Sequence, residues 1–71
     1  MNNMKKPTIK ERREEILRII VKRGGIDNIL NEDYNEVKAR IGINVTEWQN
    51  TLSYFKYSAQ GQAKVLKALT A

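Results

Sequence analysis

The sequence predicts a small all-α protein, a bundle of three or four helices in a single domain. Apolar residues recur at the three- and four-residue spacing of amphipathic helices, and residues that cap helices precede several of these stretches. The 71 residues suffice for one domain with a thin core. The chain has no Cys and no His, so no disulfide or thiolate metal site can reinforce that core.

The first helix is expected to begin after Thr8, following residues 1–7, which we interpret as a flexible basic arm. Thr8 and Glu11 have the spacing of a capping box, in which each side chain accepts a hydrogen bond from the other residue's backbone N–H. Five apolar residues form one stripe along this helix: Ile9, Ile16, Leu17, Ile20 and Val21. Gly24 and Gly25 should end it, because glycine adopts the left-handed conformation of a helix C-cap at little cost.

The second helix is preceded by residues 26–30, which are compatible with a turn or a short strand. Asp33 and Glu36 suggest a second capping box, which would open a helix that runs to about Ile41 and ends at Gly42. Its buried face should consist of three residues: Tyr34, Val37 and Ile41.

The third helix has two alternative caps, Asn44 with Glu47 or Thr46 with Gln49. Large apolar side chains recur in it at i, i+4 and i+7, which predicts that they belong to the core: Trp48, Leu52 and Phe55.

The C-terminal segment has two interpretations. After a polar break at residues 58–61, residues 63–69 are rich in Ala, Leu and Lys, which favours a fourth short helix. The alternative is the β-hairpin of a winged helix, with Gln60 and Gly61 at its turn. Either element would complete a single domain over residues 8–71.

Residues 34–57 resemble the helix-turn-helix DNA-binding domains. The apolar and turn-glycine positions of that motif are occupied here by Val37, Ile41, Gly42, Ile43 and Trp48. Two positions depart from it, since Lys38 stands in place of a small residue and Thr51 in place of an apolar one. The resemblance implies that the second helix of the motif enters the major groove of DNA.

The DNA-binding residues implied by this resemblance lie on the exposed face of the third helix: Thr46, Gln49, Asn50, Ser53, Lys56 and Tyr57. The amides of Gln49 and Asn50 suit the N6/N7 edge of adenine. On the first helix, Lys10 and Arg13 would hold phosphates, together with the N-terminal arm.

The net charge of +5 is unevenly distributed. Residues 1–25 carry eight basic and three acidic side chains. Residues 26–50 carry two basic and five acidic side chains, and residues 51–71 carry three basic side chains and no acidic one. The basic ends favour DNA, with RNA as a weaker possibility. The acidic middle favours the alternative, a module that docks on another protein, such as a polymerase or a regulator, without binding DNA.

We therefore predict a sequence-specific protein that binds double-stranded DNA as a homodimer, a transcriptional regulator of a phage, plasmid or similar element. No catalytic residue, metal or cofactor is expected, because the chain has no His or Cys and its serines have no evident activating partner. A cytoplasmic protein without a membrane partner is expected, since no apolar run approaches the ~18 residues of a bilayer span.

Overall fold

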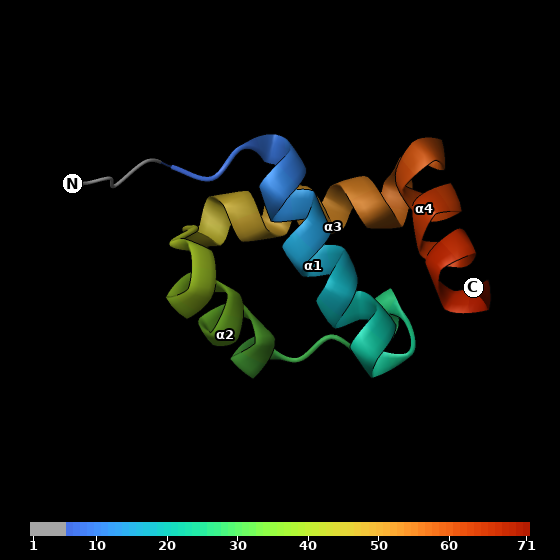
Figure 1. Cartoon of the computed structure of the whole chain (residues 1–71), viewed down its shortest axis with the longest axis horizontal. Helices are drawn as coiled ribbons and strands as arrows, with labels where there is room; N and C mark the ends of the chain where they lie inside the picture. Colours follow the sequence, from blue (N-terminus) through green and yellow to red (C-terminus); the bar gives the residue numbers. More distant parts are fainter. Residues whose placement is uncertain (1–5) are drawn as a thin grey trace.

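The computed structural model describes residues 6–71, which form four α-helices and one short 3₁₀ helix (Figure 1). The elements in chain order are α1 (Ile9–Arg23), η1 (Ile26–Asn28), α2 (Asn31–Ile41), α3 (Val45–Tyr57) and α4 (Ala59–Thr70). No strand occurs in this range, so the predicted all-α bundle is confirmed and the alternative C-terminal hairpin is wrong. Of the predicted arm over residues 1–7, residues 1–5 lie outside the described residues, and Lys6 and Pro7 belong to no helix.

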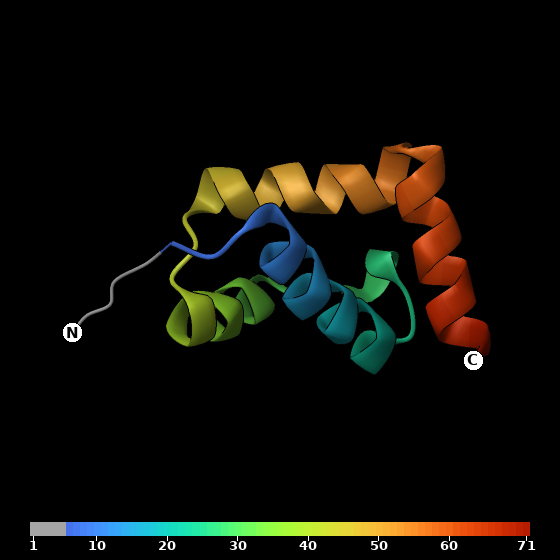
Figure 2. The same ribbon diagram turned by 45° about the horizontal axis from the view of Figure 1, so that its top comes forward.

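The bundle is organised around α1, which lies between α2 and α4 in Figure 1 and contacts all three other α-helices. In Figure 2, α3 lies across one side of α1 and α2, and α4 turns away from the C-terminal end of α3. The central position of α1 means that more than one stripe of its surface must be apolar.

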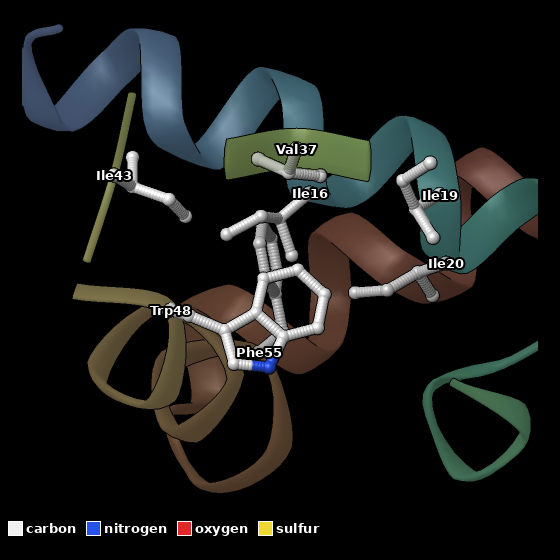
Figure 3. Close-up of a cluster of buried hydrophobic side chains, with 7 residues drawn as sticks. All are labelled: Ile16, Ile19, Ile20, Val37, Ile43, Trp48 and Phe55. Atoms are coloured by element: carbon white, nitrogen blue, oxygen red, sulfur yellow. The ribbon is translucent and has the colours of Figure 1, made fainter. Parts of the chain in front are cut away.

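The core draws on α1, α2, α3 and the α2–α3 connection (Figure 3), and consists of Ile16, Ile19, Ile20, Val37, Ile43, Trp48 and Phe55. Ile19 lies outside the predicted stripe but is fully buried, because α1 is covered by other helices on several sides. Conversely, Ile9 and Val21 of that stripe remain 56% and 39% exposed.

The predicted ends of α1 are confirmed. The Thr8 hydroxyl accepts a hydrogen bond from the Glu11 N–H at 3.1 Å, and the Glu11 carboxylate accepts one from the Thr8 N–H at 2.7 Å. Gly24 has a φ of +81°, and its N–H bonds to the carbonyls of the last turn. The capping box and the C-cap glycine each involve residues close together in the sequence, so the sequence alone was enough to predict both ends of α1.

The start of α2 differs from the prediction. The helix begins at Asn31, and Asp33 lies inside its first turn, where the carboxylate accepts a hydrogen bond from the Leu30 N–H at 2.8 Å. Asp33 also pairs with Arg23, so it joins the end of α1 to the start of α2. The predicted Asp33–Glu36 capping box is wrong, because the Glu36 carboxylate binds basic side chains of α1 instead.

The connection between α2 and α3 follows the prediction more closely. Gly42 ends α2 with a φ of +74°. Of the two alternative caps of α3, the structure shows Asn44 with Glu47, whose reciprocal hydrogen bonds are 2.8 and 3.0 Å long. Trp48 and Phe55 are buried as predicted, and Leu52 is half-buried.

A sharp corner joins α3 to α4. Only Ser58 separates the two helices, so the predicted break over residues 58–61 is wrong beyond its first residue. Gly61 lies within the first turn of α4 and is buried. A Cβ atom at this position would overlap the carbonyl oxygen of Tyr54 and come within 2.8 Å of the Phe55 Cα. Gly61 therefore permits the close approach of α4 to the backbone of α3.

We expect Gly61→Ala to destabilise the protein by about 1–3 kcal/mol, because the new methyl group would push α4 away from backbone atoms of α3. In an open helix the same change stabilises by about 1 kcal/mol, so the sign of the effect is diagnostic. Thermal unfolding followed by circular dichroism measures it. Gln60→Ala, at the exposed preceding position, is the control and should leave the melting temperature unchanged or slightly raised. If Gly61→Ala raised the melting temperature, the close approach of α4 to the α3 backbone at Gly61 would be contradicted.

Candidate nucleic-acid interface

The six polar or aromatic positions predicted on α3 are all exposed. We call them the α3 face: Thr46, Gln49, Asn50, Ser53, Lys56 and Tyr57. They lie opposite the buried side of the helix, which is formed by Trp48, Thr51 and Phe55. The α3 face contains no acidic side chain, and Lys56 gives it a positive formal charge.

Glu47, the acid nearest to this face, is half-buried and fully engaged. Its carboxylate caps α3 through the Asn44 N–H and forms an ion pair of 3.0 Å with Arg12. The ion pair neutralises Glu47 and holds the first half of α1 against α3. The positive end of the α3 dipole at this terminus would also favour a nearby phosphate.

The acidic residues of the middle segment are largely neutralised by α1. Arg23 donates to Asp33 at 2.8 Å, Arg18 lies 3.1 Å from Glu36, and these pairs join α1 to α2. The hydrogen bond from Arg23 lowers the pKa of Asp33 below its ordinary value, despite the opposing effect of burial. Asp33 and Glu36, two of the acids that argued against DNA binding, thus form ion pairs within the fold.

Seven basic side chains have no ion-pair partner among residues 6–71: Lys6, Lys10, Arg13, Lys38, Lys56, Lys64 and Lys67. Three of them line one groove together with Phe55 of α3 and are called the basic cluster here: Lys10, Arg13 and Lys64. The guanidinium carbon of Arg13 lies 3.7 Å from the centre of the Tyr54 ring, and the Lys64 ammonium lies 5.9 Å from it.

The basic cluster borders the α3 face. Tyr54 is one helical turn from both Asn50 and Tyr57, so the side chains of these three residues occupy adjacent positions along α3. Arg13, predicted as a phosphate contact, therefore lies on the Asn50 side of the α3 face, and Lys10, the other predicted contact, lines the same groove as Arg13. Sequence reasoning missed Lys64, because its approach to α1 depends on how α4 turns back at Ser58.

The opposite edge of the α3 face adjoins an open groove of about 500 Å³ between α3 and residues 26–31. Gln49, Ser53, Lys56 and Tyr57 line it from α3, and Asp27 lies on its other wall. The structure thus divides the two predicted adenine readers, since Gln49 borders this groove and Asn50 lies on the side of the basic cluster. Asp27 is the acid that a phosphate would meet at this edge.

Within residues 6–71, no helix combines the length and apolar character that a bilayer span requires. The same range contains no group of three or more acidic, His or Cys side chains placed to hold a metal ion. Comparisons with models of known protein families, with curated proteins and with solved structures give no match.

Proposed function

We propose that this protein binds double-stranded DNA in a sequence-specific manner, with α2 and α3 acting as a helix-turn-helix. The observation that supports this most directly is the exposed α3 face, free of acidic side chains and bordered by the basic cluster. A helix of this kind fits the major groove, and cations beside it suit the flanking phosphates.

In this mechanism the two parts of the surface have different roles. Gln49 and Asn50 read bases, each with an amide that can both donate to and accept from an adenine edge. Lys10, Arg13 and Lys56 hold phosphates, releasing counterions as they bind. Arg13 is preorganised for this role by its stacking on the Tyr54 ring.

The proposal extends to a homodimeric, cytoplasmic regulator of transcription in a phage, plasmid or similar element. Two leucines of α4 support the dimer, since Leu66 is 64% exposed and Leu69 is 40% exposed. A second copy of the chain would remove this apolar surface from water.

Asn50→Ala and Gln49→Ala should each reduce the preference for the cognate duplex over an unrelated duplex by about 1–3 kcal/mol, because each removes a bidentate base contact. Both residues are exposed, so the melting temperature should stay unchanged. The cognate duplex is first selected from a random pool with the wild-type protein, and fluorescence anisotropy across a salt series then gives the affinities. The logarithm of the affinity should fall linearly with the logarithm of salt concentration.

Asn35→Ala is the matched control, since Asn35 is an exposed amide on α2, outside the α3 face. If the wild-type protein bound the cognate and an unrelated duplex with equal affinity, or if its affinity did not change with salt concentration, sequence-specific DNA binding would be contradicted. Absence of any DNA complex at low salt would favour the alternative of a protein-interaction module.

A further inference from the structure

A second groove, of about 370 Å³, lies between α1 and α4, beside the α3 face. Its walls are apolar and come from Ile9, Leu17 and Phe55. Its charged rim consists of the basic cluster and one acid, Glu14. The groove thus combines apolar surface with a net positive rim.

The apolar part of this groove is not explained by DNA. Phosphates would pair with Lys10, Arg13 and Lys64, but they offer no apolar surface for Ile9, which is 56% exposed at the first position of α1. A partner that covers this side chain removes apolar surface from water, which favours binding. The ligand that matches both parts of the groove is apolar along one side and acidic at its edges.

We propose that the α1–α4 groove binds an acidic amphipathic helix of a partner protein. Apolar side chains at i, i+3 or i+4, and i+7 of that helix would enter between α1 and α4, as in other helix-in-groove complexes. Its carboxylates would pair with Lys10, Arg13 and Lys64, which have no ion-pair partner among residues 6–71. This proposal does not require DNA binding by α3, although a partner helix and DNA phosphates would both use Lys10 and Arg13.

The Tyr54 ring lies beneath Arg13, one of the basic residues that line this groove. Its hydroxyl is buried and has no hydrogen-bond partner among residues 6–71, although its ring lies against Arg13.

The test uses two synthetic peptides labelled with fluorescein, one a helix former with Leu at the i, i+3, i+4 and i+7 positions and Glu elsewhere, the other a scrambled peptide of the same composition. Fluorescence anisotropy at physiological salt gives the dissociation constants for the full chain. The amphipathic peptide should bind at least about tenfold more tightly than the scrambled one, because only it presents a continuous apolar side.

Ile9→Asp should weaken binding of the amphipathic peptide at least about tenfold, because it places a carboxylate among the apolar walls and beside the acids of the ligand. Val45→Asp is its matched control, with an effect below about twofold. Ile9 and Val45 are each the first residue of a helix, are 56% and 51% exposed, and tolerate an acid at the positive end of a helix dipole.

A second pair of variants tests the rim. Lys64→Glu should weaken peptide binding about fivefold or more. Lys67 is on the same helix but outside the groove, so Lys67→Glu should change peptide binding less than about twofold at physiological salt concentration. Equal binding of the two peptides, no binding of either, or equal losses in Ile9→Asp and Val45→Asp would each overturn the proposal. Loss of DNA binding in Ile9→Asp, without peptide binding by the wild type, would assign the groove to DNA instead.

Discussion

Replacing Trp48 with alanine is expected to abolish the cooperative thermal transition or to lower its midpoint by more than ~12 °C. The indole is 7% exposed and packs against the Tyr34 ring, with 5.7 Å between ring centres, in the core shared by α1, α2 and α3. Truncating a buried Trp costs about 3–5 kcal/mol. A domain of this size has a total stability of only about 4–10 kcal/mol, so this single change removes much of it.

Circular dichroism with temperature measures the effect, and Tyr57→Ala is the control. Tyr57 is on the same helix but is 73% exposed, so its truncation should change stability by less than ~0.5 kcal/mol. If Trp48→Ala kept the wild-type melt and lost only nucleic-acid binding, Trp48 would be a stacking surface for bases and not a core residue.

Asp33→Asn should destabilise the protein by about 2–3 kcal/mol at neutral pH, because it leaves Arg23 facing an amide that cannot replace the ion pair. The Asp33 side chain is 1% exposed and accepts hydrogen bonds from Arg23 at 2.8 and 3.1 Å. Glu32→Gln is the matched control. Glu32 is 76% exposed and 3.9 Å from the same guanidinium, so its neutralisation should have almost no effect.

The same ion pair predicts how stability depends on pH. The hydrogen bond from Arg23 lowers the pKa of Asp33 in the folded state, so the pair stabilises the fold fully above the ordinary Asp pKa of about 3.9. That stabilisation is lost as the pH falls through the lowered folded-state value. Urea unfolding between pH 7 and strongly acidic pH should therefore show a smaller acid-induced loss in Asp33→Asn than in the wild type. Equal losses would show that Arg23 does not stabilise the Asp33 carboxylate.

Helix boundaries were predictable where the signal lies within one turn of sequence. Thr8 and Gly42 are such positions, since each acts on backbone groups of its own helix. Asp33 was misassigned because its partner, Arg23, belongs to another helix, and a carboxylate three residues before Glu36 imitates a capping box. The sequence predicts a break that includes Gly61, because the close approach of α4 to α3, which requires glycine, is a tertiary feature.

The candidate site was predictable to a similar degree. Helical periodicity was enough to predict that Gln49 and Asn50 would be exposed together on α3. The association of Arg13 with Tyr54 and Lys64 could not be inferred, because it depends on the packing of α1 against α3 and α4. Local patterns thus predicted the residues proposed to read bases, together with Lys10 and Arg13, and tertiary packing added Lys64 to these cations.

The corner at Ser58 has a consequence for the order in which the chain assembles. Because one residue joins α3 to α4, these two helices can meet with almost no loss of loop entropy. The contact from α1 to α3 through Arg12 and Glu47 spans 35 residues and requires a much larger loop to close. We therefore expect α3 and α4 to pair early, so that α1, the first of the four α-helices to leave the ribosome, is the last to reach all its neighbours.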